Sequence, residues 1–131
     1  MEPVIDGRVL VAGEASGSAL VLDEPLSFWG GLDPETGAIV EANHPQRGAS
    51  VTGRILVMPS GRGSSSSATV LAEAIRLGTG PAGIVLGEPD DILAIGALVA
   101  AELYGMSTPV VVADPGVYAS IRDADPINLV G

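Results

Sequence analysis

The hydrophobic and polar positions of this chain divide it into a front half rich in predicted strands and a back half in which strands and helices alternate. Apolar runs at residues 9–12 and 19–22, separated by a turn that contains glycine and serine, predict a short β-hairpin. The segment at residues 54–59, which is continuously apolar after Arg54, predicts a buried strand that ends at a proline. This order favours one α/β domain over residues 1–131, built as β/β/α layers rather than as a doubly wound sheet.

The back half contains two predicted helices. The first begins near Ser66 or Ser67 and has Gly78 as its C-cap. Its buried face is expected to consist of Val70, Leu71, Ala74 and Ile75. The second helix is predicted from Asp90 or Asp91 to about Leu103, and the residues expected to face inward are Ile92, Leu93, Ile95, Leu98 and Val99. Strands at 38–41, 82–86 and 109–113, a helical turn at 115–121 and an edge strand at 127–130 complete the pattern.

Composition and charge narrow the classes of function. The chain has 131 residues, of which 47% are apolar and none is cysteine, so it offers no disulfide, cysteine nucleophile or thiolate ligand for an iron–sulfur cluster. Its formal net charge of −10 repels phosphate backbones and argues against a nucleic-acid partner. The longest apolar stretch, residues 92–101, is about half as long as a membrane span. Because its start lacks the pattern of a secretory signal, the chain is expected to be cytoplasmic.

A serine-rich segment, Ser-Gly-Arg-Gly-Ser-Ser-Ser-Ser at residues 60–67, joins the predicted buried strand to the first predicted helix. Backbone N–H groups at a helix N-terminus bind anions, and the glycines let the backbone approach a ligand closely. Exposed hydroxyls there can donate or accept a proton, and the helix field would stabilise a serine alkoxide. A serine that acts as a base is therefore chemically possible. The alternative is an ordinary N-cap with solvated serines.

Other chemistries fit this segment less well. It lacks the lysine of the phosphate-loop pattern, the third glycine of the dinucleotide pattern and the Gly-x-Ser-x-Gly nucleophile elbow. A triad of Ser64 with His44 and an aspartate stays open, although a histidine in an Asn-His-Pro turn is more often structural. The irregular residues 24–37 hold the only Phe and Trp of the chain, Phe28 and Trp29, which suit either an interface or the core.

Three motifs occur in order along the chain: Leu-Ser-Phe-Trp-Gly-Gly-Leu-Asp-Pro-Glu-Thr-Gly at residues 26–37, His44-Pro45 with Gly48, and Gly61-Arg62-Gly63-Ser64-Ser65. Together they resemble the small subunit of the aconitase X family over nearly the whole chain. The resemblance implies the swivelling β/β/α domain of aconitase-like enzymes, present as a polypeptide that pairs with a large subunit. That subunit is expected to carry the metal, as iron or an iron–sulfur cluster, whereas this chain is expected to bind no cofactor.

The resemblance also implies roles for the residues of the serine-rich segment. Ser64 would be the general base, Ser65 would hydrogen-bond the substrate and Gly63 would shape the loop. In ordinary aconitases an arginine follows the two serines and binds a substrate carboxylate, but this chain has Ser66 there. The carboxylate contact is therefore expected from Arg62 or from the large subunit. In the implied mechanism the metal centre polarises the leaving hydroxyl while Ser64 takes the proton from the neighbouring carbon.

Characterised members of the family dehydrate either cis-3-hydroxy-L-proline or mevalonate 5-phosphate, both small hydroxy acids. A phosphate favours cationic neighbours, whereas this chain offers only Arg62 near the loop and has no lysine, so the hydroxyproline reaction is favoured. Two alternatives remain: a non-catalytic binding or regulatory module, and a phosphohistidine-type carrier with an exposed His44. The resemblance gives no chemical role to Asp33 or His44, and the surroundings of Asp33 also fit an ordinary turn.

Overall fold

The backbone follows the predicted alternation of elements closely in its second half. A computed structural model describes residues 4–5, 7–62 and 65–131. Its strands are β1 (Val4–Ile5), β2 (Arg8–Val11), β3 (Glu14–Val21), β4 (Ile55–Met58), β5 (Gly83–Leu86), β6 (Val110–Val112) and β7 (Pro126–Val130). Its helices are α1 (Phe28–Gly31), α2 (Ser66–Leu77), α3 (Asp91–Tyr104) and α4 (Pro115–Ser120).

The strands form one sheet in the order β1-β7-β3-β4-β5-β6-β2. Strands β3, β4, β5 and β6 run parallel, while β7 and β2 lie antiparallel to their neighbours β3 and β6. All four residues of β4 and all four of β5 are buried, which explains their continuous apolar sequences. The central strand predicted at 54–59 and the strands predicted at 82–86 and 109–113 are thereby confirmed.

The hairpin predicted from residues 9–12 and 19–22 is wrong. Strand β2 pairs with β6, and β3 pairs with β7 and β4. Between β2 and β3, Gly13 exchanges backbone hydrogen bonds with Gly131, at 3.4 Å from Gly13 N to Gly131 O and 2.8 Å for the reverse bond. The C-terminal strand thus takes the place beside β3 that a hairpin partner would have filled.

Two further strand predictions need correction. The strand predicted at the sheet edge, residues 127–130, is part of β7 and lies between β1 and β3. The strand predicted at 38–41 is reduced to isolated bridges that pair Ile39 with Leu32 and Ala38 with Ser50. These bridges fold the segment between α1 and β4 back on itself instead of adding it to the sheet.

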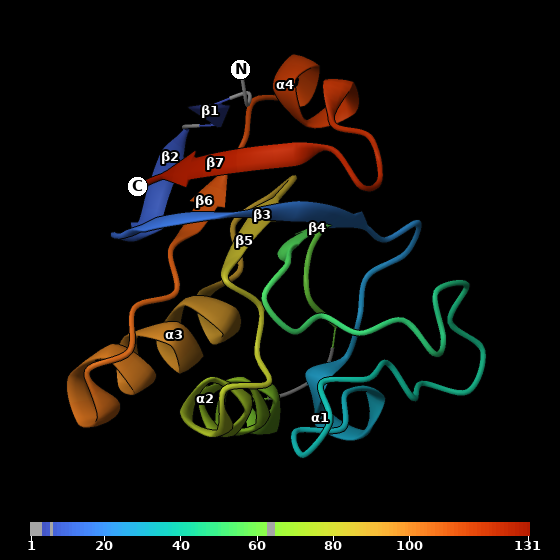
Figure 1. The fold of residues 1–131 in the computed structure, drawn as a ribbon, viewed down its shortest axis with the longest axis vertical. Coiled ribbons are helices and arrows are strands. Elements are labelled where there is room, and N and C mark those ends of the chain that lie inside the picture. Colours follow the sequence, from blue (N-terminus) through green and yellow to red (C-terminus); the bar gives the residue numbers. More distant parts are fainter. Residues whose placement is uncertain (1–3, 6, 63–64) are drawn as a thin grey trace.

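The sheet separates two cores, as the period-2 alternation of strand side chains requires. On one face, Leu56, Met58, Ile84 and Leu86 pack toward α1, α2 and α3 (Figure 1). On the other face, Ile55, Val57, Val85 and Val111 meet Ile127 and Leu129 of β7 and residues of the α4 region. The fold is therefore a mixed α/β half-barrel sheet with helices, and the predicted β/β/α architecture is confirmed.

Helices α2 and α3 approach each other closely. A Cβ atom built on Gly96 of α3 would lie 2.8 Å from the carbonyl oxygen of Ala68 in α2. Small side chains suit such an approach, and the inward face of α3 consists of Gly96 and three alanines, Ala94, Ala97 and Ala100, together with one large residue, Leu93. The predicted inward face is wrong for three large residues, which are exposed: Ile95, Leu98 and Val99. Because α3 is apolar all round, its periodicity could not distinguish the two faces.

The helix ends agree with the sequence. Gly78 caps α2 in the left-handed conformation, with φ of 79°. The predicted buried face of α2 is confirmed for Leu71, Ala74 and Ile75, and Val70 is partly buried against the same core. Asp90 caps α3 through its side chain, which accepts hydrogen bonds from the first turn. Within the described residues, every helix is too short or too polar to cross a membrane.

Candidate functional site

The serine-rich segment lies between the end of β4 and the start of α2, as the sequence predicts. Two of its candidate residues, Gly63 and Ser64, lie outside the described residues. Ser65 immediately precedes α2 with helical dihedrals (φ −56°, ψ −22°), and its side chain is exposed and makes no capping hydrogen bond in the described structure. The N-cap alternative is therefore wrong for the Ser65 hydroxyl, which is left at the surface beside the helix N-terminus.

The start of the segment is held by its backbone. The Gly61 N–H donates to Asp90 Oδ2 at 2.9 Å, and the Arg62 N–H donates to the Leu26 carbonyl at 3.0 Å. Gly61 also forms an isolated parallel bridge with Leu26. Two consecutive amides thus bind two different parts of the fold, the N-terminal cap of α3 and the segment that precedes α1.

Arg62 is already paired with carboxylates of its own chain. Its Nη1 lies 3.3 Å from Glu41 Oε2, and its Nη2 lies 3.6 Å from Glu24 Oε1. The other oxygen of Glu41, Oε1, accepts a hydrogen bond from the Ser27 N–H at 3.1 Å. Since the Arg62 side chain is half exposed, it can still reach a ligand, but a substrate carboxylate would compete with two internal ones. The role of Arg62 in substrate binding stays a prediction.

The end of the segment is held from α1. The hydroxyl of Ser67, a buried residue, accepts a hydrogen bond from the Trp29 N–H at 3.3 Å. The two aromatic residues of α1 differ in burial: Phe28 is fully buried in the core, whereas Trp29 is 61% exposed. The core interpretation is therefore confirmed for Phe28, whereas the interface role stays a prediction for Trp29, which is exposed and lies next to the serine-rich segment.

Two hollows adjoin the segment. The smaller, about 30 Å³, lies between its ends and α3 and is lined by Gly61, Arg62, Ser67, Asp90, Ile92 and Leu93. This volume suits about one water molecule. The larger, about 350 Å³, starts at Ser65 and runs between α2 and α3 over a mainly apolar lining that includes Ile95, Val99 and Tyr104. Such a lining does not suit a charged hydroxy acid.

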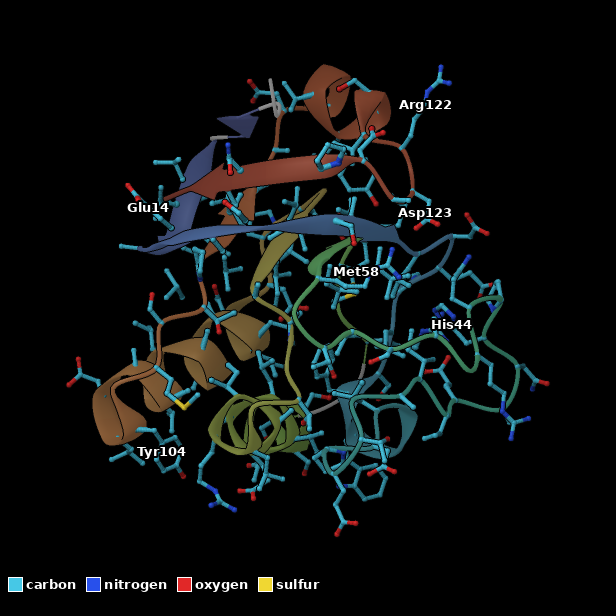
Figure 2. All side chains as sticks on the ribbon, in the orientation of Figure 1. Glu14, His44, Met58, Tyr104, Arg122 and Asp123 are labelled. Atoms are coloured by element: carbon cyan, nitrogen blue, oxygen red, sulfur yellow. The ribbon has the colours of Figure 1, made fainter. Side chains whose placement is uncertain are left out.

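His44 has a structural role. It is 4% exposed, its Nδ1 accepts from the Gln46 N–H at 3.0 Å, and its Nε2 lies 3.1 Å from the Glu24 carbonyl. Since Nδ1 accepts, Nε2 carries the proton and donates it to that carbonyl. Figure 2 shows His44 on the loop side of the molecule, apart from α2 and α3. The carrier hypothesis, which needs an exposed His44, is wrong, and both nitrogens that a triad would use are occupied by backbone groups.

Asp33 forms a turn. Its Oδ1 accepts from the Glu35 N–H at 2.9 Å, and its carbonyl accepts from the Gly37 N–H at 2.7 Å. Gly37 has a φ of 78°, which glycine adopts readily. The turn interpretation of the Asp-Pro-Glu-Thr-Gly sequence is confirmed.

Sequence reasoning missed two residues that bind the segment. Glu41 carried no signal, because its contacts with Arg62 and Ser27 are made only in the folded chain. Asp90 was found as a helix cap, but the contact of its second oxygen with Gly61 was not. As for metal ligands, no group of three or more His, Asp or Glu residues suited to a metal occurs in the part of the chain that the structure describes.

A half-barrel β/β/α domain that presents a serine- and glycine-rich loop at a helix N-terminus is the architecture of a swivelling domain of aconitase-like proteins. The chain belongs to the aconitase X swivel domain family, whose model matches residues 4–131. In structure it is similar to Thermococcus kodakaraensis aconitase X in its holo-form, with a TM-score of 0.81 and 34% sequence identity over 95% of this chain and 88% of that one.

Several relatives of the chain are named as dehydratases. The chain is 50% identical over 103 residues to the cis-3-hydroxy-L-proline dehydratase of Pseudomonas aeruginosa, a match that covers 79% of this chain and 18% of that protein. It is 43% identical over 94 residues to the phosphomevalonate dehydratase small subunit of Thermococcus gammatolerans, which covers 72% of each chain. The chain thus spans about a fifth of the hydroxyproline dehydratase and most of the phosphomevalonate dehydratase small subunit.

Proposed function

We propose that this chain is the small subunit of a hydro-lyase that removes water from cis-3-hydroxy-L-proline, and that it is active only with a large metal-bearing subunit. The observation that supports this proposal most directly is the 50% identity over 103 residues to a cis-3-hydroxy-L-proline dehydratase. In this proposal the chain contributes the general base Ser64, with Gly63 shaping the loop and Ser65 hydrogen-bonding the substrate.

The anchoring of the loop supports a role in catalysis. Backbone and side-chain hydrogen bonds hold Gly61, Arg62 and Ser67, which are described residues on either side of Gly63 and Ser64. Helix α2 has 12 residues, and its N-terminus carries a partial positive charge that favours an anion nearby. The same field would stabilise the alkoxide form of Ser64 and a substrate carboxylate.

The proposed reaction is a proton abstraction followed by loss of hydroxide. The Ser64 alkoxide takes the proton from the carbon next to the hydroxyl-bearing carbon, and the electrons of that C–H bond form the carbon–carbon double bond. The C–O bond breaks with its electron pair on oxygen, the hydroxide takes a proton from solvent to become water, and Ser64 returns its proton to solvent. The substrate carboxylate would bind Arg62 or a group of the large subunit.

The residues that the structure describes do not fit a metal or an iron–sulfur cluster. The sequence has no cysteine, and the described residues bring together no set of three His, Asp or Glu side chains suited to a metal. The proposal therefore assigns iron or an iron–sulfur cluster to the large subunit and derives no step of the reaction from it. The proposal also places the complex in the cytoplasm. It includes no membrane or nucleic-acid partner, because a net charge of −10 on this chain repels anionic surfaces.

A second candidate substrate is mevalonate 5-phosphate. It is favoured by the 43% identity to a phosphomevalonate dehydratase small subunit over 72% of each chain. Against it stands the scarcity of cations near the loop: the chain has no lysine, and Arg62 is already paired with Glu24 and Glu41. A phosphate would then depend on cations of the large subunit.

The test is reconstitution with an aconitase X large subunit from the same genome and an assay of water loss from both substrates. We expect activity on cis-3-hydroxy-L-proline, and we expect Ser64→Ala to lower kcat by a factor of about 100 or more while the subunits still assemble. Ser107→Ala is the matched control. Asp90, which binds the loop, caps the N-terminus of α3, whereas Ser107 follows the C-terminus of that helix, so the same substitution there should leave turnover unchanged. Activity on mevalonate 5-phosphate alone would select the second substrate, and a Ser64→Ala complex with full turnover would favour a non-catalytic binding or regulatory module.

A further inference from the structure

Asp90 serves two elements with one carboxylate. Its Oδ1 accepts from the Ile92 N–H at 3.0 Å and from the Leu93 N–H at 3.1 Å, which caps α3. Its Oδ2 accepts from the Gly61 N–H at 2.9 Å. An N-cap needs only one oxygen, so the second contact is not explained by capping.

The space around Gly61 shows how closely the loop is pressed against this carboxylate. A Cβ atom on Gly61 would lie 2.6 Å from Asp90 Oδ2 and 3.0 Å from Leu93 Cδ1. Gly61 is not among the glycines with positive φ, so its conformation is open to any residue. A side chain at residue 61 would displace the Asp90 carboxylate, so glycine serves close approach here and not an unusual backbone angle.

The backbone N–H groups of Gly61 and Arg62 point in different directions. The Gly61 N–H points to α3 through Asp90, and the next amide, of Arg62, points to the Leu26 carbonyl on the other side. The chain is thus fixed between two elements directly before residues 63 and 64. A charge-assisted hydrogen bond is about twice as strong as a neutral one, so the carboxylate contact is the stronger of the two.

We propose that Asp90 is a positioning residue of the dehydration reaction: its Oδ2 fixes the Gly61 amide and thereby orients the loop that carries Ser64. This inference rests on the proposed function, since it takes Ser64 to be the base. It assigns Asp90 no contact with the substrate and no proton transfer.

Two substitutions separate the positioning contact from the helix cap. Asparagine and serine both cap helices about as well as aspartate. In Asp90→Asn the side-chain oxygen can still cap α3, but an NH₂ group then faces the Gly61 N–H, and two donors cannot bond. In Asp90→Ser the hydroxyl caps α3 and no second oxygen remains. Asp91→Asn is the matched control, because Asp91 is exposed and its substitution removes the same charge from the same helix terminus.

In the reconstituted complex we expect Asp90→Asn and Asp90→Ser to lower kcat about tenfold or more with KM changed by less than about twofold. Asp91→Asn should retain the wild-type values. A cap with a purely structural role would lower the stability of α3 and the yield of complex instead. An unchanged kcat in both Asp90 variants, or an equal loss in Asp91→Asn, would overturn the proposal.

A second readout uses the chain alone and requires no activity. In ¹H–¹⁵N spectra, the Gly61 amide of Asp90→Asn should move upfield and exchange faster with solvent, while the Ile92 and Leu93 amides stay protected. A Gly61 amide that is unchanged in both Asp90 variants would show that the contact does not hold the loop and would overturn the proposal. A wild-type complex that dehydrates neither substrate, with Gly61 shifted as expected, would instead overturn the proposed function and leave Asp90 as the anchor of the loop.

Discussion

Glu41 holds Arg62 at the start of the serine-rich loop, with Arg62 Nη1 at 3.3 Å from Glu41 Oε2. The remaining Glu41 oxygen accepts from the Ser27 N–H, so this one carboxylate ties the loop to the segment before α1. The guanidinium is oriented but not free. Any ligand that binds Arg62 must share it with this partner.

We predict that Arg62→Ala raises KM for the hydroxy-acid substrate about tenfold, since a charge-assisted contact is lost. Glu41→Gln should lower KM, because a neutral amide competes less for the guanidinium. Both variants should change the free energy of unfolding by no more than about 1 kcal/mol, as is usual for exposed ion pairs. Steady-state kinetics and urea unfolding measure the two effects. If KM is the same in wild type and Arg62→Ala, the carboxylate contact belongs to the large subunit.

The exposed Trp29 predicts a contact with the partner. Trp29→Ala should weaken assembly with the large subunit about 30-fold, because exposed aromatics at interfaces often contribute 2 kcal/mol or more. The stability of the free chain should stay within about 0.5 kcal/mol of wild type. Phe28→Ala is the contrasting variant, since Phe28 is fully buried and its loss should cost about 3–5 kcal/mol of stability. Titration calorimetry would contradict the assignment if Trp29→Ala assembled with unchanged affinity.

The close approach of α2 and α3 predicts an unusual response to alanine. Gly96→Ala should destabilise the chain by about 1–3 kcal/mol although alanine favours helices, because its Cβ would meet the Ala68 carbonyl at 2.8 Å. Gly116→Ala in α4 is the control: apart from its chain neighbours and the backbone of its own helix, no described atom lies within 4 Å of its Cβ position, so the substitution should be neutral or mildly stabilising. Urea unfolding measures the free energy of unfolding of both variants. Equal changes in the two variants would contradict the prediction and would mean that α2 and α3 can move apart.

Burial raises the pKa of Tyr118 above its usual value, because the surrounding apolar residues disfavour the phenolate. The folded chain therefore holds this proton more tightly than the unfolded chain. The corresponding stability is present below a pH of about 10 and is lost as the pH rises through the pKa of the folded state. We predict that Tyr118→Phe flattens the alkaline fall in the free energy of unfolding between about pH 9 and 11. Identical profiles for wild type and variant would contradict this prediction.

The sequence predicted helices and strands correctly where the structure of a segment depends only on adjacent residues. The apolar run of β4, the left-handed Gly78 at the end of α2 and the Asp90 cap of α3 each depend on a few adjacent residues. The location of the serine-rich loop was predictable for the same reason, since a strand, glycines, serines and a helix follow one another directly. The family resemblance added the fold as a whole.

Pairing over long distances was not predictable. The alternation of β2 and β3 specified strands but not partners, and the partner of Gly13 is Gly131, at the other end of the chain. The prediction of which face of α3 points inward was wrong because large and small apolar residues occur on both of its faces. At the site, the contacts of Glu41 with Arg62 and of Asp90 with Gly61 join residues 21 and 29 positions apart, for which the sequence carries no signal.

The apolar outer face of α3 has a consequence for how the free chain behaves at different ionic strengths. Ile95, Leu98 and Leu103 are 53%, 46% and 69% exposed on a chain with a net charge of −10. In dilute buffer, mutual repulsion between copies of this charge opposes their association. At about 1 M salt the Debye length falls to about 3 Å, and this repulsion is screened while apolar attraction persists. We therefore expect the colloidal stability of the unassembled chain to depend on its charge, and we expect α3 to form the first apolar contacts between copies at high salt.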